Sequence, residues 1–298
     1  MENKNIKIAF ILQCHKNSMQ INKLTKKLTE AENTEVFIHL DKKSLDLSSE
    51  IIINERIHLL LPADAVDVVW GGYSQCRATL NLIKAVIDAD KNYDFVVLLS
   101  GQDYPIKSIG RFVEYMSSHK NEIFMELVPQ NAPNYGGYDA RNDIFYPNFL
   151  TGRTKPVRIA RKTYSTVLST LHIHRKRIFP KLYYGSSWWA IPGECAEEIY
   201  NYCSNDGNVE KYFSHSMCSD ECLFQTLAMK LFPDRKYNRK LTFTDWSTNQ
   251  NSPKTLSVSD LDKVVSADCK YYFARKIDEE QEPNILSLID KLVTDRSL

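Results

Sequence analysis

The feature that most constrains the fold of this chain is an apolar run at residues 95–99 that ends abruptly in a turn of small and polar residues. Five consecutive apolar residues, three of them Val or Phe, are typical of a strand buried on both faces of a mostly parallel sheet. Such sheets bind ligands beyond the carboxyl ends of their strands, where Gly101 and Asp103 fall. Pro105 prevents a strand or helix from continuing. The run therefore predicts an α/β protein with a site near residue 101.

Strand-like and helix-like segments alternate over the first hundred residues. We expect strands at 6–13, 35–41, 56–61 and 94–100, and helices at 19–30 and from an N-cap at Ser74 onward. This alternation predicts a right-handed parallel α/β sheet. His15, Asp41 and Asp103 would lie at one edge of it, because each follows a predicted strand. No glycine-rich phosphate-binding motif follows the first strand, so a phosphate would be held by other groups. Further helices are expected at 194–204, 220–231 and 285–293.

Composition narrows the class of protein. The chain has 298 residues and a net charge of +1, which gives no global argument for nucleic acid as a partner. No apolar run approaches the ~20 residues of a membrane span. The first residues lack the pattern of a signal peptide, so we expect a cytoplasmic protein. None of the seven cysteines forms a Cys-x-x-Cys pair. We therefore expect reduced, mostly buried thiols rather than disulfides or zinc ligands.

The middle of the sequence is strongly basic. Residues 144–193 contain no Asp or Glu but nine basic residues, namely Arg153, Lys155, Arg158, Arg161, Lys162, Arg175, Lys176, Arg177 and Lys181. A solvated basic surface is the simplest interpretation. Alternatively, residues 153–181 attract an anionic acceptor or make peripheral contact with the inner face of the cell membrane. Aromatic residues interleave near its end, but no RNA- or DNA-binding motif accompanies them, and we expect no nucleic acid partner.

Two adjacent carboxylates, Asp220 and Glu221, follow Ser219 at the expected start of a helix. One interpretation is a plain capping motif, with Ser219 as N-cap and the carboxylates stabilised as anions by the helix dipole. The other is that one carboxylate, deprotonated at pH 7, faces the crevice as a general base. Aromatic rings such as Trp188 and Trp246 could stack on sugar rings or fill the core.

The sequence offers two Asp-x-Asp pairs of the kind that hold a metal ion against a diphosphate in many glycosyltransferases. Asp88 and Asp90 lie at a helix end, and Asp260 and Asp262 lie at a helix start. Both lie away from the end of the strand that such a pair requires, so we interpret them as structural and expect neither metal nor another cofactor. Cationic side chains near the C-terminus would neutralise a leaving diphosphate instead.

Eight segments of the chain resemble one family in the same order, namely 39–44, 69–74, 98–107, 185–190, 219–224, 244–246, 252–255 and 273–278. Together they resemble the core-2/I-branching β-1,6-N-acetylglucosaminyltransferase family, glycosyltransferase family 14, which also contains peptide O-xylosyltransferases. The likeness extends over about residues 6–280. Its Ser-Gly-Gln-Asp-Tyr-Pro-Ile-Lys and Phe-Ala-Arg-Lys blocks are the most specific.

The resemblance implies a GT-A-type nucleotide-diphosphosugar fold with a central, mostly parallel sheet flanked by helices. It also implies an inverting, metal-independent transfer from a UDP-sugar, with Glu221 as the catalytic base. We expect the donor to contact His15, Asp41, Trp70, Gly101, Asp103, Lys254, Arg275 and Lys276, of which Asp41, Trp70, Lys254 and Lys276 are carried over from the family. We expect the acceptor to contact Ser187, Trp188, Asp220 and Trp246, of which Trp246 is carried over from the family. We expect a single domain, 1–298, with a nucleotide-binding half at about 1–128 and an acceptor-binding half at about 129–298.

The animal members of this family are Golgi proteins with a membrane anchor and disulfides, features not expected for this chain. We therefore expect a bacterial member that adds a sugar, with GlcNAc as the leading candidate, to a hydroxyl of an oligosaccharide or lipid-linked glycan of the cell surface. The alternatives are transfer of xylose or a hexose on the same fold, a glycoside hydrolase that uses Asp103 and Glu221, and a sugar-nucleotide-binding protein without turnover.

Overall fold

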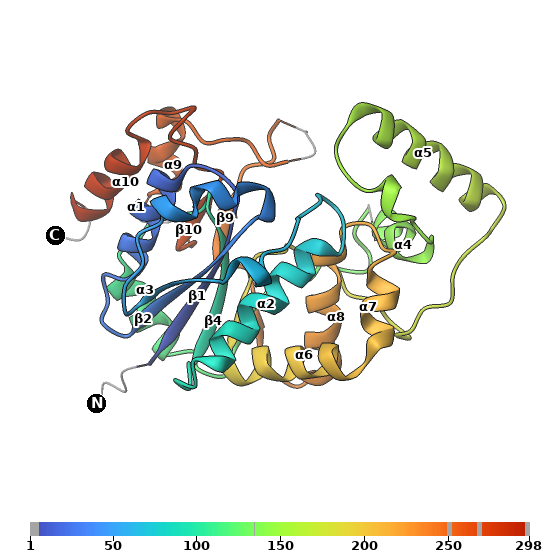
Figure 1. Cartoon of the computed structure of the whole chain (residues 1–298), viewed down its shortest axis with the longest axis horizontal. Coiled ribbons are helices and arrows are strands. Elements are labelled where there is room, and N and C mark those ends of the chain that lie inside the picture. Colours follow the sequence, from blue (N-terminus) through green and yellow to red (C-terminus); the bar gives the residue numbers. More distant parts are fainter. Residues whose placement is uncertain (1–5, 134, 249–251, 267–269, 296–298) are drawn as a thin grey trace.

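A computed structural model describes residues 6–133, 135–248, 252–266 and 270–295. Its centre is a seven-stranded sheet in the order β3-β2-β1-β4-β7-β6-β8 (Figure 1). The strands are β1 (Ile8–Cys14), β2 (Thr34–Leu40), β3 (Ile57–Leu59), β4 (Phe95–Ser100), β6 (Ile123–Phe124), β7 (Ala190–Pro192) and β8 (Tyr237–Asn238). The first four are parallel, and β7 runs antiparallel to β4 and β6. The predicted mostly parallel sheet is confirmed.

Both faces of the sheet are covered, which explains why its strands read as continuous apolar runs. Phe10, Leu12 and Val97 point to the face packed by α1 (Ser18–Leu28), α3 (Ile109–Ser117) and α10 (Ile285–Asp295). Ile11 and Leu98 point to the other face, packed by α2 (Ser74–Asp88), α6 (Gly193–Asn205) and α8 (Leu223–Leu231). Alternate residues of one strand therefore serve two separate cores.

A small second sheet carries the C-terminal part of the chain to the site. Its order is β5-β10-β9, formed by β5 (Tyr104–Pro105), β10 (Phe273–Arg275) and β9 (Thr242–Thr244). Ala274 of β10 is the antiparallel partner of Tyr104, so the register places Arg275 opposite Asp103. A residue near position 275 thus reaches the carboxyl end of β4.

The remaining helices lie to one side of the sheet. They are α4 (Tyr135–Asp143), α5 (Lys155–Thr170) and α7 (Gly207–Phe213), and a short α9 (Leu261–Val264) lies near α10 (Figure 1). Among the described residues, no helix has both the length and the apolar character required to cross a bilayer. The six cysteines in the described residues are free, five of them buried, as predicted; Cys269 lies outside the described residues.

Two predicted helix caps are wrong. Helix α2 begins at Ser74 rather than after it, and the Ser74 hydroxyl accepts a hydrogen bond from the Val69 amide at 2.8 Å. Ser219 begins a separate 3-10 turn, η4 (Ser219–Glu221), and α8 starts only at Leu223. Cys218 has a left-handed backbone (φ 53°) and Cys222 a φ of −136°, and these angles isolate the turn from the helices around it. The two carboxylates therefore do not lie in the first turn of α8.

Candidate active site

The predicted site lies at the carboxyl ends of β1 and β4. The Gly101 amide donates to the Gln13 carbonyl at 3.0 Å, and a Cβ on Gly101 would lie 3.2 Å from the Cys14 sulfur, so the turn packs closely on β1. Asp103 is completely buried, and one of its oxygens accepts a hydrogen bond from the Ser100 amide. Burial raises the pKa of the Asp103 carboxyl, while Arg275 opposes that shift.

Arg275 lies between Asp103 and Trp188. Only 7% of its surface is exposed, and its guanidinium lies 3.9 Å from the centre of the Trp188 ring. Its Nη1 is 3.6 Å from an Asp103 oxygen, and its Nε and Nη1 have no hydrogen-bond acceptor among the described residues. Buried N–H groups are almost always paired, so unpaired guanidinium donors mark a place for an anionic ligand such as a diphosphate.

Further cations surround Arg275. Burial and the charges of Arg275 and Arg153 lower the pKa of Lys276 to about 8. Burial and the charge of Lys16 lower the pKa of His15, and Lys276 contributes in the same direction. Lowered pKa values of cationic groups indicate that positive charge is crowded here, and an anion would relieve it.

The carboxylate pair is connected to this region through Ser187, the residue before Trp188. Asp220 is buried and accepts a hydrogen bond from the Ser187 hydroxyl at 2.5 Å. Glu221 is about a third exposed (34% of its side chain) and accepts a hydrogen bond from Arg141 Nη1 at 2.7 Å. Burial, followed by the charge of Asp220, raises the pKa of Glu221 to about 7. The predicted helix cap would have lowered the pKa of the carboxylate, whereas burial raises it. A carboxyl group with a pKa near 7 can exchange a proton at neutral pH.

The two halves of the site are joined through Ser187 and Trp188. Ser187 holds Asp220, and Trp188 lies against Arg275. Three residues predicted to bind the acceptor line a small cavity together with Gln13 near the end of β1, namely Ser187, Trp188 and Asp220. The charges of Asp220 and Arg275 also influence each other, since each shifts the pKa of the other. The turn that carries Asp220 and Glu221 therefore lies close enough to Arg275 for the charges of Asp220 and Arg275 to interact.

Three other predicted donor residues, Asp41, Trp70 and Lys254, make the following contacts. Asp41 is buried, caps the turn η1 (Lys42–Glu50) by accepting from the Lys43 amide, and pairs with the Lys43 ammonium at 3.1 Å. Trp70 lies beneath Arg153, whose guanidinium is 4.5 Å from the ring centre. The Lys254 backbone is next to Lys276, whose amide donates to the Lys254 carbonyl.

Two predicted site residues differ from expectation: the Lys254 ammonium is paired with Asp260, and the Trp246 side chain lies at the surface. The Lys254 ammonium lies 2.8 Å from both oxygens of Asp260, so its charge is already neutralised. The Trp246 side chain follows β9 and is half exposed at the surface. Asp260 also caps its own turn with Ser257, in agreement with the structural role predicted for it. Within the described ranges, no cluster of three His, Cys, Asp or Glu side chains could hold a metal ion.

Arg141, which pairs with the predicted base, was not identified from the sequence. It comes from α4, where Gly136, Gly137 and several polar residues leave no apolar periodicity to predict a helix. Its guanidinium also lies 4.8 Å from the centre of the Tyr138 ring, which is stacked on Tyr184. No local signal in the sequence indicates that Arg141 reaches Glu221, because the contact joins segments 80 residues apart.

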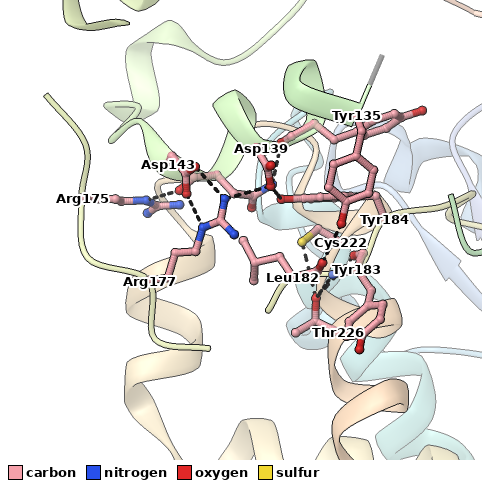
Figure 2. Close-up of polar contacts among 12 residues, drawn as sticks. Tyr135, Asp139, Asp143, Arg175, Arg177, Leu182, Tyr183, Tyr184, Cys222 and Thr226 are labelled. Atoms are coloured by element: carbon pink, nitrogen blue, oxygen red, sulfur yellow. Dashed lines mark hydrogen bonds and ion pairs between the residues drawn. The ribbon is translucent and has the colours of Figure 1, made fainter. Parts of the chain in front are cut away.

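Figure 2 shows how α4 is fastened. Arg177 donates to both oxygens of Asp143, at 2.5 and 2.6 Å, and to Asp139 at 2.8 Å. Asp139 also accepts from the Tyr184 hydroxyl at 2.8 Å. Arg175 donates to backbone carbonyls of Asn142 and Tyr212. The interpretation of residues 144–193 as a solvated basic surface is thus wrong for Arg175 and Arg177. We call the group Asp139, Asp143, Arg177 and Tyr184 the Arg177 clasp.

Comparison with known proteins identifies the family. A family model described as Core-2/I-Branching enzyme matches residues 8–265. Xylosyltransferase oxt of Drosophila melanogaster is 26% identical over 128 residues, 42% of this chain and 14% of that protein. Xylosyltransferase sqv-6 of Caenorhabditis briggsae is 23% identical over 251 residues, 82% of this chain and 29% of that protein. Human N-acetyllactosaminide beta-1,6-N-acetylglucosaminyl-transferase is 24% identical over 153 residues, 50% of this chain and 34% of that protein.

Because the family model spans most of the chain, the chain belongs to the Core-2/I-branching enzyme family of glycosyltransferases. The resemblance seen in the sequence is confirmed at this level. The chain spans less than a third of the length of the xylosyltransferases it matches. Among solved structures, the 4-diphosphocytidyl-2C-methyl-D-erythritol synthase of Anaerococcus prevotii has a TM-score of 0.41 and 11% identity, over 79% of this chain and 86% of that one.

Proposed function

We propose that the protein is an inverting glycosyltransferase that moves a sugar from a UDP-sugar to a hydroxyl of an acceptor glycan without a metal ion. The observation that carries this proposal is Arg275. Its buried Nε and Nη1 lack an acceptor among the described residues, and it interacts with the charge of Asp220, the neighbour of Glu221. A cation for the leaving group and a base for the nucleophile are what a single displacement requires.

The leaving diphosphate would bind to Arg275 and Lys276. Both cations lie at the carboxyl end of β4, and burial strengthens their interaction with an anion. Lys276 titrates near pH 8, so a bound diphosphate would raise its pKa and keep it protonated. Lys254 would have to exchange Asp260 for the diphosphate to contribute, and we assign it the smaller share.

Glu221 would act as the general base. Its carboxylate would take the proton of an acceptor hydroxyl while that oxygen bonds to the anomeric carbon of the donor sugar. The bond from this carbon to the UDP oxygen breaks on the opposite face, and UDP leaves with its electron pair. One displacement inverts the anomeric centre. Ser187, Asp220 and Trp188 would position the acceptor.

The transferred sugar is GlcNAc or xylose in this proposal. Relatives of both kinds match the chain, one named as an N-acetylglucosaminyl-transferase and several as xylosyltransferases. The sequence arguments favour GlcNAc and a role in bacterial surface polysaccharide synthesis. The acceptor would then be an oligosaccharide or lipid-linked glycan on the cytoplasmic side of the membrane.

A glycoside hydrolase is the weaker candidate. It needs two carboxyl groups that reach the bond from opposite sides, and Asp103 was the second one proposed. Asp103 is fully buried, accepts from the Ser100 amide and lies against Arg275. A carboxyl group in this position supports the cation and does not reach a glycosidic oxygen.

The test is a thermal-shift panel of UDP-, GDP-, TDP- and CMP-sugars in the presence of EDTA. A ligand that binds only the folded protein raises the melting temperature, by an amount equivalent to about 2.7 kcal/mol at one hundred times its Kd. We expect UDP-GlcNAc or UDP-xylose to give the largest shift without metal. A shift that appears only with Mn²⁺, or only with a different nucleotide, would refute the proposed donor chemistry.

A further inference from the structure

Helix α5 presents a basic face away from the body of the protein. Its half-buried residues Val157, Arg161, Tyr164 and Leu168 follow one another at spacings of four, three and four. These spacings place them on one side of a helix. Arg161 donates to the carbonyls of Leu150 and Gly152, which fixes that side against the protein. In Figure 1, α5 lies at the edge of the molecule, at the opposite end from α1 and α10.

The opposite side of α5 is exposed and carries positive charge. We call Lys155, Arg158, Ile159, Lys162 and Thr166 the α5 face, and all five are exposed. Residues 144–193 contain no Asp or Glu, and among the described residues no acidic side chain pairs with the three cations of this face. Its charge is therefore not compensated by local carboxylates.

Apolar side chains accompany these cations. Ile159 is 59% exposed on the face itself, and Phe149 and Leu171, near the two ends of the helix, are 76% and 61% exposed. An exposed apolar side chain beside cations, as Ile159 is, can enter the apolar boundary of a lipid surface. A polyanion such as nucleic acid or an acidic glycan would use the cations and leave the apolar groups in water. A lipid surface with anionic headgroups uses both.

We propose that the α5 face is a docking surface for an anionic membrane. Lys155, Arg158 and Lys162 would lie among the headgroup phosphates. Ile159, with Phe149 at the preceding turn η3 (Asn148–Leu150), would enter the boundary between headgroups and acyl chains. The helix would lie in the plane of the surface, since its inner side remains attached to the protein through Arg161.

This surface lies next to the catalytic crevice. Arg153, just before α5, covers Trp70 and lowers the pKa of Lys276, and α4 supplies Arg141 to Glu221. A docked enzyme would thus hold its crevice close to the bilayer, which suits a lipid-linked acceptor. This consequence rests on the proposed function, whereas the docking itself does not.

The experiment is co-sedimentation of the full chain with vesicles, without donor or acceptor. Vesicles of phosphatidylcholine alone are compared with vesicles that also contain phosphatidylglycerol. We expect binding only to the second kind, and weaker binding as salt is added. Two basic residues near an anionic surface increase the membrane partition coefficient roughly 30-fold. The variant R158Q/K162Q should therefore bind these vesicles about 30-fold more weakly. The charge-matched control K26Q/K291Q changes exposed lysines of α1 and α10 and should bind like the wild type.

The apolar contribution is tested with Phe149→Ser and Ile159→Ser, each expected to weaken binding by about 3- to 10-fold. Binding to dextran sulfate, a soluble polyanion, tests whether the α5 face binds polyanions in general rather than a membrane. Unchanged binding of the serine variants, or of R158Q/K162Q, overturns the docking surface, as does an equal loss in the control. Binding to dextran sulfate but to no vesicle overturns it in favour of a polyanion. Turnover on a soluble acceptor without any vesicle binding would refute docking and leave the proposed function intact.

Discussion

Two arginines of this protein lie close to carboxylates in very different ways. Arg177 donates three charge-assisted hydrogen bonds from its Nε and Nη2 to the carboxylates of Asp139 and Asp143. Arg275 is more deeply buried, yet its closest carboxylate oxygen is 3.6 Å away and two of its nitrogens lack an acceptor among the described residues.

We interpret this as the difference between a structural cation and a cation that is proposed to bind a ligand. A satisfied, bidentate ion pair contributes to the folded state as it stands. A buried cation without sufficient partners costs free energy until an anion arrives, and natural proteins keep such costs mainly at functional sites. We therefore expect substitutions in the clasp to reduce stability while preserving activity, and substitutions in the crevice to do the reverse.

The sharpest test of this comparison is Glu221→Gln. Removal of a positioned base should lower kcat by roughly 10²–10⁴-fold. The folded protein raises the pKa of Glu221 from 4.5 to about 7, so it binds this proton more tightly than the unfolded chain does. The free energy of unfolding therefore falls as the pH rises from about 4.5 to about 7, and the variant avoids that loss. At pH 8 its melting temperature should exceed that of the wild type by roughly 2–4 °C.

Turnover and melting curves at pH 8 measure both effects, and binding of the UDP-sugar should be retained. A variant with turnover near the wild-type value would remove Glu221 from the role of base. A variant that is both slow and less stable would place Glu221 with the structural residues of the clasp.

Lys276→Ala tests the cationic side of the crevice. A hydrogen bond to a charged group is worth about 1.5–3 kcal/mol, so the KM for the donor should rise roughly 10- to 100-fold. Because crowding with Arg275 and Arg153 already disfavours the Lys276 charge, the free protein should not lose stability. Lys26→Ala, on an exposed face of α1, is the matched control. Loss of wild-type activity on addition of EDTA would contradict neutralisation of the diphosphate by protein cations alone.

Arg177→Met tests the clasp. It leaves Asp139 and Asp143 without their cation in a partly buried position, which should lower the free energy of unfolding by about 1–3 kcal/mol. Turnover per folded molecule should change less than tenfold. Arg77→Met breaks an exposed ion pair with Glu210 and should cost less than about 1 kcal/mol. Urea unfolding of the two variants measures the difference, and equal losses would show that the clasp is no stronger than a surface pair.

The Arg177 clasp and the region around Arg275 also differ in how much of each the sequence predicts. Strands β1, β2 and β4 begin and end within two residues of their predicted positions, because burial on both faces leaves a continuous apolar signal. The position of Asp103 at the end of β4 follows from that signal. The approach of Arg275 depends on the pairing of β10 with β5, whose partners Ala274 and Tyr104 are 170 positions apart in the sequence, and only the family resemblance indicated it.

The clasp and the carboxylate turn escaped prediction for another reason. Helix α4, which carries both carboxylates of the clasp, has Asn142 as its one fully buried residue among those described, so its sequence carries little periodicity. The Ser219-Asp220-Glu221 segment has the composition of an N-cap, but tertiary packing closes it as a separate turn. Burial then raises the pKa values of both carboxylates, the opposite of what the capping motif predicts. Local sequence specifies local hydrogen bonds, whereas desolvation depends on the whole fold.

Arg141 connects the two regions, because α4 carries both the carboxylates of the clasp and the guanidinium that pairs with Glu221. The Arg141 charge lowers the pKa of Glu221, so its removal in Arg141→Gln should raise that pKa further. The wild-type kcat/KM should increase with pH through about 7 and then level off, since the base must be deprotonated.

In Arg141→Gln this rise should move to higher pH, with a plateau within about tenfold of the wild type. Arg141→Lys keeps the cation and should restore the inflection to near 7. The pH dependence of kcat/KM for the three proteins distinguishes an electrostatic role from a purely structural one. A uniform loss of activity at every pH, not rescued by lysine, would mean that Arg141 acts only by holding α4 in place.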